Sequence, residues 1–321
     1  PRQRAMGVQI AALAPEGLPD AVPRVRFRDL WKLWQRPTGA RFRVWHARRN
    51  TEMLPGIFMR DILRMPLKLV FTSAAQRDHS GYTKWLIRRM DVVIATSTQA
   101  ASYLQVPHTV IMHGIDTARF SPPVDKAAAK GAVGLDPAKK VIGCFGRIRH
   151  QKGTDRFVDA MIAVMPSNTD WIAVITGRVT AEHQGFADAM HAKIAAAGLS
   201  DRFLFPGEVD DVRPWYQALD LFAAPQRWEG FGLTPLEAMA CGVPVIATPV
   251  GAFPELVRHD VTGLVTANDD AAYRTAVAAL LPDDKRRDQM ALACRLHIEQ
   301  NFRLEREADD INAVYERLLR A

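Results

Sequence analysis

The sequence predicts an α/β protein of two domains, each built on a parallel sheet that is wound by helices on both faces. Short apolar segments alternate with helical segments along the whole chain, which is the pattern of parallel sheets with crossover helices. The chain has 321 residues, of which 48% are hydrophobic and 24% charged, so two globular cores of ordinary size are expected. The balance of charge also changes sign partway along the chain, at a segment that contains prolines.

The first half contains five apolar segments that we expect to be strands, each followed by a segment of helical pattern. They cover residues 8–13, 42–45, 68–71, 91–95 and 108–112. Prolines interrupt the pattern around Phe120–Asp125, so the first domain is expected to span residues 1–121, with a linker after it. A doubly wound domain normally opens with a strand and a tight glycine turn. Neither precedes Val8, so the first strand of this domain is expected to be missing.

The second half repeats the same alternation, and the second domain is expected to span residues 122–303. The charged helical segment that follows, residues 304–321, is expected to form a C-terminal helix. Its periodicity leaves two placements open, because it could close the second domain or cross back to the first. Strands of the second domain are expected to begin at Val141, Ile172, Phe203, Leu219, Val243 and Leu264.

Composition excludes several classes of protein. No apolar run is long enough to span a bilayer and no signal peptide is evident, so a cytoplasmic protein is expected. The three cysteines, Cys144, Cys241 and Cys294, are scattered among apolar residues. That distribution indicates reduced structural thiols and argues against disulfides or a zinc site.

The basic excess lies in the first domain, where residues 1–121 carry a net charge of +11 while the remainder carries −4. Nine cations fall between Arg24 and Arg49 beside a single acid, Asp29. Basic residues with tryptophans favour an anionic membrane surface, where each cation contributes about 1 kcal/mol. An acidic acceptor, RNA, or no partner at all are the alternatives for such a basic face. The tryptophans among these cations are Trp31, Trp34 and Trp45.

The most informative segment of the chain is the glycine-rich loop and helix from residue 227 to residue 247. It carries Glu229 on the loop and Glu237 in the first turn of the helix. Thr234, Pro235 and Glu237 are typical of a helix cap, a first helical residue and a capping-box acid. A turn of this kind directs free backbone N–H groups and the positive end of a helix at one point, which favours a phosphate. We therefore expect a phosphorylated ligand between two carboxylates that bind hydroxyls, although capping alone would also explain Glu237.

A second glycine turn follows the expected strand at Val141. It carries Arg147 and Lys152 before a helix that begins near Thr154, with a spacing that differs from a Walker A loop. The two cations lie at the carboxyl edge of a parallel sheet, where open α/β folds bind ligands, and both side chains bind phosphate. Two solvated cations are the alternative for this turn by itself. Its position on the same sheet edge as Glu229 favours a shared ligand site.

These segments together resemble the family 4 retaining glycosyltransferases. The resemblance covers residues 108–281 well, and it implies the GT-B architecture of two facing Rossmann-like domains, with the sugar-nucleotide donor held mainly by the second. The matching motifs are Gly146-Arg147 with Lys152-Gly153, Glu229 with Glu237, Gly242-Val243-Pro244-Val245-Ile246-Ala247, Gly251 with Pro254-Glu255, and Thr262-Gly263-Leu264-Val265.

The resemblance also implies roles for individual residues. Glu229, Arg147 and Lys152 are implied to be catalytic, the two cations binding the donor diphosphate and Glu229 contacting the hydroxyls of the donor sugar. Glu237 is implied to bind the ribose, the loop backbone to hold phosphate, and the 206–211 loop to border the nucleobase. The implied donor-binding residues are Glu237, Gly230, Phe231, Gly232, Leu233, Thr234, Val209 and Asp211.

The first half resembles the family at fewer places. His46 matches a strand-end histidine of the family, and His113 stands where an asparagine is usual. A histidine whose pKa lies near 6.5 can transfer protons or contact phosphate. His46, His113 and the neighbouring Arg48 are expected to contact the acceptor or a phosphate. For His113, a histidine that is satisfied within its own loop is the alternative.

Two short segments, 46–50 and 83–91, resemble mannosyltransferases that build the lipopolysaccharide inner core of Gram-negative bacteria. The implied reaction transfers mannose from GDP-mannose to an anionic glycolipid or oligosaccharide acceptor with retention. The chain contains no D-x-D triplet, so we expect no metal and no other cofactor, with the cations and the helix start neutralising the diphosphate.

Three alternatives to this reaction are kept. They are a UDP-hexose donor, a GT-B epimerase or phosphorylase, which the glutamate spacing disfavours, and a non-catalytic membrane- or nucleic-acid-binding module on a decayed transferase scaffold. The basic first domain favours a peripheral site on the cytoplasmic face of the inner membrane, and nucleic acid is not the expected partner.

Overall fold

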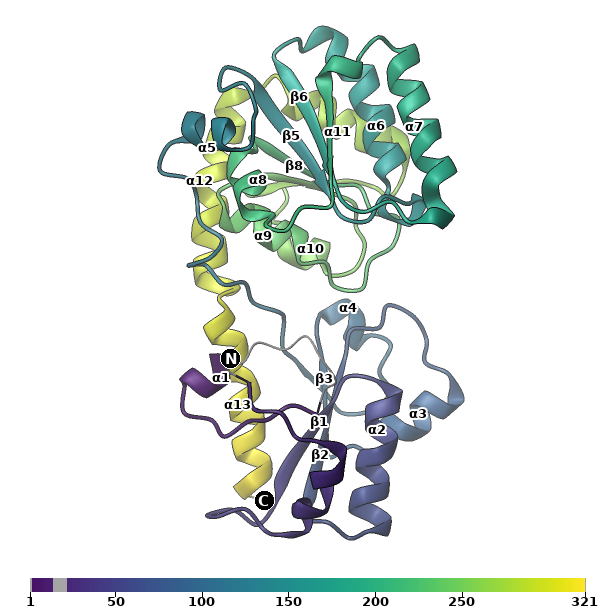
Figure 1. Cartoon of the computed structure of the whole chain (residues 1–321), viewed down its shortest axis with the longest axis vertical. Helices are drawn as coiled ribbons and strands as arrows, with labels where there is room; N and C mark the ends of the chain where they lie inside the picture. The colour runs from purple at the N-terminus through teal and green to yellow at the C-terminus, as the bar shows by residue number, and fades with distance from the viewer. Residues whose placement is uncertain (1, 14–21, 321) are drawn as a thin grey trace. The chain divides into compact units, whose positions relative to one another are not determined.

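The computed structural model describes residues 2–13 and 22–320, which form two compact units (Figure 1). The first unit combines Pro1–Gly114 with Leu304–Ala321, and the second is Ile115–Arg303. The sequence predicts the division after residue 121, but the chain enters the second unit before the prolines. The backbone N–H of Ile115 donates to the carbonyl of Phe302 at 2.7 Å, and the carbonyl of Phe120 accepts from Arg295 Nη1 at 2.9 Å. The prolines therefore follow a segment that already packs on the second unit.

The first unit is built on a four-stranded parallel sheet in the order β1-β2-β3-β4. Alternate residues of β2 supply the two faces of this sheet, as the two-residue repeat of a strand requires. Leu69 and Phe71 pack into the larger core of the unit, and Val70 packs on the other face. The strands are β1 (Arg43–Ala47), β2 (Leu67–Ser73), β3 (Val92–Ala95) and β4 (Thr109–Val110).

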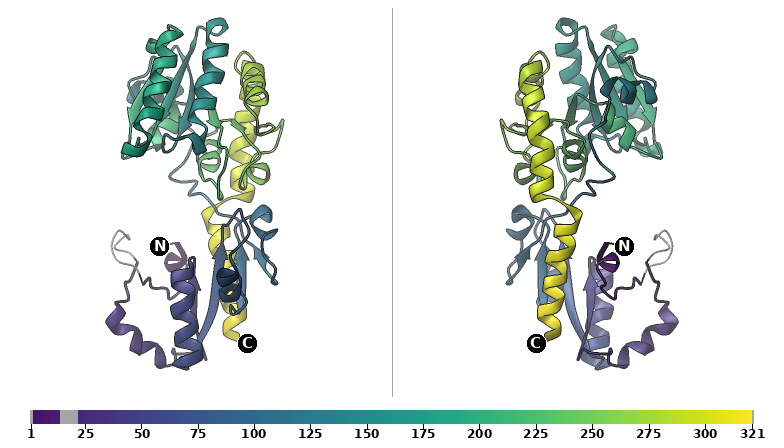
Figure 2. Two further views of the ribbon diagram at one scale, coloured as in Figure 1. Left: turned by 90° about the vertical axis from the view of Figure 1, so that its right-hand side faces the viewer. Right: turned by 90° about the vertical axis from the view of Figure 1, so that its left-hand side faces the viewer.

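Helices cover both faces of this sheet. The C-terminal helix α13 (Leu304–Arg320) packs Val314 and Leu318 against Val70 and Ile94, and Figure 2 shows it lying along the strands. It belongs to the first unit, one of the two placements that its periodicity left open. The remaining helices of this unit are α1 (Arg2–Ala5), η1 (Phe27–Trp34), α2 (Asn50–Ile57), which continues into η2 (Phe58–Ile62), α3 (Gly81–Ile87) and α4 (Thr98–Ala101).

The strand expected over residues 8–13 is wrong. Within that segment only Ala12 forms a bridge, to Arg24, and Gln9 and Ala11 are exposed. An apolar run becomes a strand only where a neighbouring strand can pair with its backbone, and no described strand pairs with this one. The other expected strands are present, with the one at 108–112 shortened to the two residues of β4.

The second unit is built on a six-stranded parallel sheet in the order β10-β9-β8-β5-β6-β7. The strands are β5 (Lys140–Phe145), β6 (Trp171–Thr176), β7 (Phe203–Gly207), β8 (Leu221–Ala224), β9 (Val245–Ala247) and β10 (Gly263–Val265). The α-helices are α5 (Lys126–Ala132), α6 (Thr154–Val164), α7 (Gln184–Ala196), α8 (Arg213–Ala218), α9 (Thr234–Ala240), α10 (Phe253–Leu256), α11 (Asp270–Leu280) and α12 (Asp284–Asn301). Short 3-10 turns cover His150–Lys152, Met165–Ser167, Ala181–His183 and Ser200–Arg202.

The strand order of the second unit defines where a ligand should bind. The chain runs outward from β5 through β6 to β7, then returns to place β8 beside β5 and continues the other way. Open α/β sheets bind ligands beyond the carboxyl ends of the strands at such a reversal. In this unit the reversal lies between β5 and β8, whose residues Ile142, Leu221 and Phe222 are fully buried.

The three cysteines are free and buried in the second unit, as the sequence predicts. Burial raises the pKa of the Cys144 and Cys241 thiols to about 12, so neither is a thiolate at neutral pH. Over the ranges that the structure describes, no helix combines the length and the apolar character needed to cross a membrane.

Candidate active site

The turn that follows β5 lies directly against the end of β8. Gly146 and Gly153 have φ angles of +136° and +69°, a region that favours glycine. A Cβ atom on Gly153 would lie 2.0 Å from the carbonyl oxygen of Pro225, so any side chain there would push the two loops apart. This close approach brings Lys152 beside the loop after β8.

Lys152 and Glu229 form an ion pair where these two loops meet. Lys152 Nζ lies 2.5 Å from Glu229 Oε2, and both side chains are mostly buried, with exposed fractions of 22% and 16%. The other carboxylate oxygen, Oε1, accepts the backbone N–H of Gly230 at 3.0 Å. Arg147 is exposed and makes no hydrogen bond or ion pair with the residues that the structure describes. Beside this ion pair the turn carries two further cations, Arg147 and Arg149.

The loop of Glu229 is clamped from the other side by residues 251–253. A Cβ atom on Gly232, whose φ is +86°, would lie 2.2 Å from Phe253 Cε1. A Cβ atom on Gly251 would lie 3.1 Å from the carbonyl oxygens of Glu229 and Gly230. The carbonyl of Phe231 accepts the backbone N–H of Ala252 at 3.3 Å. The predicted phosphate loop, Gly230 to Thr234, is therefore held between two glycine contacts, with Leu233 exposed near its end.

A second ion pair anchors the start of the same loop. Arg227 binds Asp155 in a bidentate manner, with Nη1–Oδ1 at 2.6 Å and Nη2–Oδ2 at 3.0 Å. Arg227 Nη1 also donates to the carbonyl of His150 at 2.8 Å, and its backbone N–H donates to that of Gln151 at 3.0 Å. The pair joins the loop after β8 to the first turn of α6. Sequence reasoning missed it, because no local pattern relates residues this far apart.

The capping box predicted at the start of α9 is wrong. Thr234 is the first helical residue, Leu233 precedes it with a helical backbone, and no side chain caps the helix. The Glu237 carboxylate is engaged elsewhere, since Oε2 accepts the hydroxyl of Tyr216 at 2.7 Å. Glu237 is therefore positioned by tertiary packing against α8, and the first-turn N–H groups of α9 have no side-chain cap.

Tyr216 is a site residue that the sequence did not reveal. Its side chain is fully buried, with ring centroids 4.8 Å from Phe145 and 5.4 Å from Phe222. Burial raises the pKa of Glu237, and the hydrogen bond from Tyr216 acts in the opposite direction. The hydroxyl thus holds one oxygen of a desolvated carboxylate and favours its ionised form.

Three buried polar atoms on these loops have no hydrogen-bond partner among the described residues. They are Arg149 Nε after β5, Gln226 Oε1 after β8 and Thr234 Oγ1 at the start of α9. Buried polar groups almost always have a partner, in the protein or in ordered water. Their concentration at the carboxyl ends of β5 and β8 points to a bound polar ligand.

Two predicted donor-binding residues, Val209 and Asp211, lie on the loop after β7, and neither has a hydrogen bond or ion pair to Glu229 or Glu237. The Asp211 carboxylate binds the Arg213 guanidinium, with Nη2–Oδ2 at 2.6 Å, and accepts the Arg213 backbone N–H at 3.0 Å. This pairing lowers the pKa of Asp211. Asp211 therefore stabilises the start of α8, the helix that carries Tyr216.

The predicted acceptor residues lie in the first unit, where two of them contact α13. His46 Nδ1 lies 2.5 Å from the hydroxyl of Tyr315 and Nε2 lies 2.6 Å from Thr72 Oγ1. Burial, with Arg48 nearby, lowers the pKa of His46 to about 4, so its ring is neutral at pH 7. His113 Nδ1 lies 2.8 Å from Glu307 Oε1. His46 thus connects β1 to α13, and His113 connects the loop after β4 to α13.

Arg48, the third predicted acceptor residue, has an exposed side chain. Its backbone N–H donates to Glu52 Oε2 at 2.6 Å, next to the start of α2. Its guanidinium is therefore positioned at the end of β1, on the surface of the first unit.

The geometry defines a class of protein: a parallel α/β protein whose second unit presents cations, two carboxylates and uncapped N–H groups at the reversal of strand order. Groups of these kinds at the carboxyl ends of parallel strands suit a phosphorylated ligand that carries hydroxyls. Anabaena Alr3699/HepE in complex with UDP shares the fold, with a TM-score of 0.77 at 23% identity over 84% of this chain and 78% of that one. The fold is therefore GT-B, as predicted.

Comparison with known sequences identifies the family. Residues 139–283 match the glycosyl transferases group 1. The whole chain is 60% identical to the lipopolysaccharide core biosynthesis mannosyltransferase LpsB of Rhizobium meliloti (strain 1021), of which it covers 92%. Over 99% of its length it is 54% identical to the lipopolysaccharide core biosynthesis mannosyltransferase LpcC of Rhizobium leguminosarum bv. viciae, of which it covers 90%. The chain belongs to the group 1 glycosyltransferases, and the predicted family and enzyme class are confirmed.

Proposed function

We propose that the protein transfers mannose from GDP-mannose to a lipopolysaccharide inner-core acceptor, with retention at the anomeric carbon. The observation that carries the proposal is the Lys152–Glu229 ion pair, in the turn that also carries Arg147, at the carboxyl ends of β5 and β8, where the strand order reverses. The orphaned hydroxyl of Thr234 at the same place supports a polar ligand. The names of the two full-length relatives support the sugar and the acceptor.

In this proposal the donor diphosphate binds Arg147, Lys152 and the first turn of α9. A guanidinium binds a phosphate in a bidentate manner, and an ammonium has three N–H donors, so Lys152 can keep its bond to Glu229 while it binds phosphate. The N–H groups of the first turn of a helix have no intrahelical partner and can complete the site. These groups stabilise the charge that develops on the departing diphosphate, and no metal or other cofactor is assigned a role.

Glu229 orients the donor sugar and Glu237 binds the ribose. Both Glu229 oxygens are held by the protein, Oε2 by Lys152 and Oε1 by the backbone N–H of Gly230, and Glu237 Oε2 is held by Tyr216. Each of these oxygens retains a lone pair for ligand hydroxyls. The bond from the anomeric carbon to the phosphate oxygen breaks, and the bond to the acceptor oxygen forms on the same face. The proton of the acceptor hydroxyl passes to the leaving phosphate, so no protein nucleophile is required.

The acceptor is an anionic glycolipid, and the protein acts as a peripheral protein on the cytoplasmic face of the inner membrane. The net charge of +11 over residues 1–121 supports an anionic partner for the first domain. His46, His113 and Arg48 are assigned to acceptor or phosphate contact, with His46 neutral and therefore a hydrogen-bonding group only.

Calorimetry with GDP, UDP, GDP-mannose and UDP-glucose tests the donor, followed by transfer of mannose to core oligosaccharide. Glu229→Ala should abolish transfer while the protein stays folded. Glu299→Ala is the matched control, because it also removes a glutamate from an ion pair, the one with Arg295 on α12. Preference for UDP would reassign the donor. Absence of binding to any nucleotide by the folded chain would refute a transferase and favour a non-catalytic binding module.

A further inference from the structure

The 3-10 helix η1 exposes three aromatic side chains. Trp31 and Trp34 are three residues apart, which places them on one side of a 3-10 helix, and Phe27 at the start of the helix has an exposed fraction of 77%. Leu30 and Leu33 pack against the core of the first unit. This helix therefore carries apolar side chains that the core does not use.

The continuous helix α2–η2 has the same property. Leu54, Phe58 and Ile62 are spaced by four residues and are exposed, Ile62 with a fraction of 67%. Met53 and Ile57 of the same helix are buried in the core. Residues spaced by four lie on one side of a helix, so the exposed side chains form a stripe along α2–η2.

Helix α3 adds a third exposed stripe. Tyr82 and Trp85 are exposed and stacked, with ring centroids 6.3 Å apart and an interplanar angle of 14°. Two hydrogen bonds connect the three helices: Trp34 Nε1 donates to the carbonyl of Leu63 at 2.8 Å, and Asn50 Nδ2 donates to Thr83 Oγ1 at 2.8 Å. The exposed apolar side chains of η1, α2–η2 and α3 are called the apolar face below.

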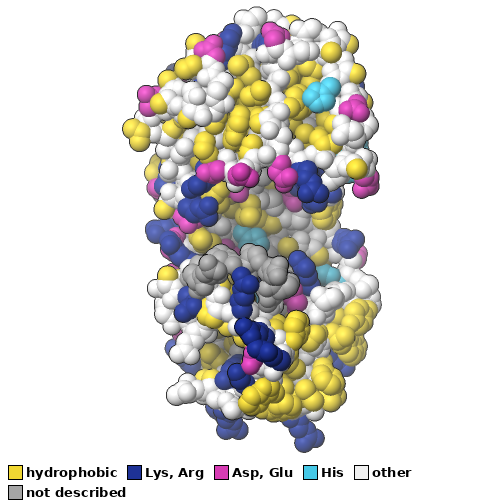
Figure 3. All heavy atoms as spheres, viewed as in Figure 1, with side chains coloured by type: hydrophobic (Ala, Val, Ile, Leu, Met, Phe, Trp, Pro, Cys, Tyr) yellow, Lys and Arg dark blue, Asp and Glu magenta, His cyan; other side chains and the backbone are white. Residues whose placement is uncertain are grey.

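Figure 3 shows this face on the surface of the first unit, with hydrophobic side chains gathered over α2 and α3 and Lys and Arg side chains next to them. Monomeric soluble proteins rarely expose an apolar patch that extends over several elements unless it binds a partner. The apolar face is therefore a candidate interaction surface.

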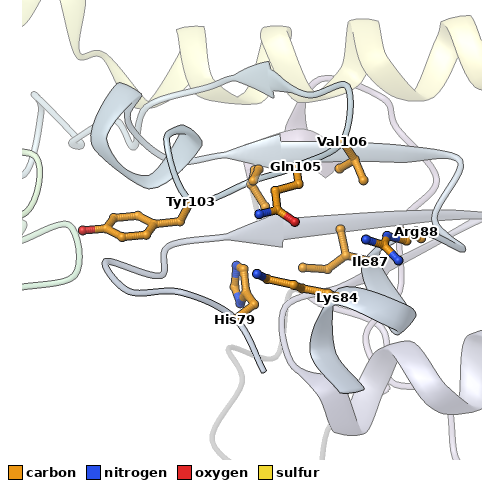
Figure 4. Close-up of a pocket in the computed structure, with 8 residues that line it drawn as sticks. His79, Lys84, Ile87, Arg88, Tyr103, Gln105 and Val106 are labelled. Carbon is orange, nitrogen blue, oxygen red and sulfur yellow. The ribbon is translucent and has the colours of Figure 1, made fainter. Parts of the chain in front are cut away.

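Cations border the apolar face. Lys32 Nζ lies 5.9 Å from the centroid of the Trp31 ring, and Arg89 Cζ lies 3.9 Å from that of Trp85. Lys84 and Arg88 are also carried by α3 or its end, and they line a pocket together with His79 and Tyr103 (Figure 4). The cations of the segment before β1 add to this charge, since residues 24–49 contain nine Lys and Arg and one acid.

We infer that the apolar face docks the protein on an anionic lipid bilayer. Aromatic side chains are favoured at the level of the lipid headgroups, and cations beside them are attracted to the anionic lipids. Apolar stripes with bordering cations are the composition of helices that lie in a membrane surface. The inference adds a docking surface to the proposed function. It rests on that function for one point, that the acceptor is a membrane glycolipid.

Sedimentation of the full chain with vesicles tests the inference directly. The chain should bind vesicles of phosphatidylethanolamine with phosphatidylglycerol, and bind pure phosphatidylcholine at least about tenfold more weakly. The variant Phe58→Ser with Ile62→Ser should lower binding to the anionic vesicles about tenfold or more without lowering the melting temperature, since both side chains are exposed. The matched control is Leu292→Ser with Leu296→Ser, two exposed leucines of α12, which should bind like the unchanged protein.

The charge contribution has its own pair of variants. Arg28→Gln with Lys32→Gln should weaken binding to anionic vesicles and make it less sensitive to salt. Arg274→Gln with Lys285→Gln, two exposed cations of the second unit, should leave binding unchanged. Equal effects of both pairs would mean that net charge alone drives binding, and would overturn the assignment of this face.

Other outcomes would also overturn the inference. The full chain could fail to bind anionic vesicles, or it could form a dimer that the Phe58→Ser, Ile62→Ser variant abolishes, so that a second copy covers the face. A transfer assay with a water-soluble deacylated acceptor separates this inference from the proposed function. The serine variant should transfer to that acceptor normally and lose activity on an acceptor in vesicles. Absence of transfer to either acceptor by the unchanged protein would refute the proposed function, and vesicle binding would still be measurable.

Discussion

Replacing Tyr216 by Phe removes the hydroxyl that donates to the Glu237 carboxylate and keeps the aromatic ring in its cluster. The hydrogen bond is 2.7 Å long and donates to a carboxylate whose pKa burial raises. Without it, Glu237 regains rotamer freedom that nucleotide binding must remove again, at a cost of about 0.5–1.5 kcal/mol. Since 1.4 kcal/mol corresponds to tenfold, the Kd for GDP should rise about 2- to 13-fold.

The kinetic and pH signatures follow from the same contact. The ribose contact is made equally in the ground state and the transition state, so KM for the donor should rise while kcat changes little. The Tyr216 hydrogen bond lowers the pKa of Glu237, so its loss raises that pKa and protonates the carboxylate at higher pH. The loss of affinity should therefore grow as pH falls. Calorimetry with GDP at two pH values, with donor saturation kinetics, measures both effects.

Tyr273→Phe is the matched control. Tyr273 is also fully buried in the second unit, and its hydroxyl makes a single long bond, 3.4 Å, to the carbonyl of Ile246. It should change stability slightly and nucleotide affinity not at all. The reasoning is refuted if Tyr216→Phe leaves the Kd unchanged at both pH values, or if Tyr273→Phe weakens binding equally.

Three further predictions concern other contacts of the two units. Gly232→Ala should destabilise the protein by about 2–4 kcal/mol in chemical denaturation, because the residue needs a positive φ and its Cβ would displace Phe253. Glu237→Gln should bind GDP poorly yet melt at the same or a higher temperature near neutral pH. Burial raises the native pKa of this carboxyl above that of the unfolded chain, so ionisation costs stability as pH rises from the unfolded to the native pKa. The advantage of Gln should grow over that range and be constant above it. The ring of His46, whose pKa is lowered to about 4, should show no NMR titration until the pH approaches that value.

Each of these three predictions has a control or a result that would contradict it. Gly185→Ala, at a helical position where nothing lies within 4 Å of the new Cβ, should be neutral or stabilising. A difference in stability between Glu237→Gln and the unchanged protein that stays constant between the unfolded and the native pKa of Glu237 would contradict the linkage argument. A His46 resonance, assigned through its loss in His46→Asn, that titrates near pH 6.5 would show an exposed and unbonded ring.

Most of the fold and half of the site could be predicted because the determining signals are local. Alternating apolar and helical segments specify parallel sheets, and the carboxyl ends of parallel strands share one edge. That rule alone places Arg147, Lys152 and Glu229 at one edge of the sheet, and in the structure Lys152 Nζ lies 2.5 Å from Glu229 Oε2. Gly153 and Gly232 also carry information, since both occupy turns with positive φ and near contacts.

The errors share a different physical origin. The apolar run at residues 8–13 has the composition of a strand, but no described strand lies where its backbone could pair. The spacing of Thr234 and Glu237 is that of a capping box, but the desolvated carboxylate gains more from a hydroxyl on another helix. Local patterns describe which conformations a segment can adopt. They do not describe which competing partner a buried polar group finds.

By itself, then, the sequence determined the α/β class, the family and most of the strands along the chain, and it predicted the cations and carboxylate of the candidate site. Only the tertiary structure decided that α13 covers the sheet of the first unit, that Tyr216 holds Glu237, and that Asp155 anchors Arg227. These contacts join residues far apart in the chain. They depend on which helix packs on which face of a sheet. The burial of whole apolar faces determines that packing, and no short sequence pattern encodes it.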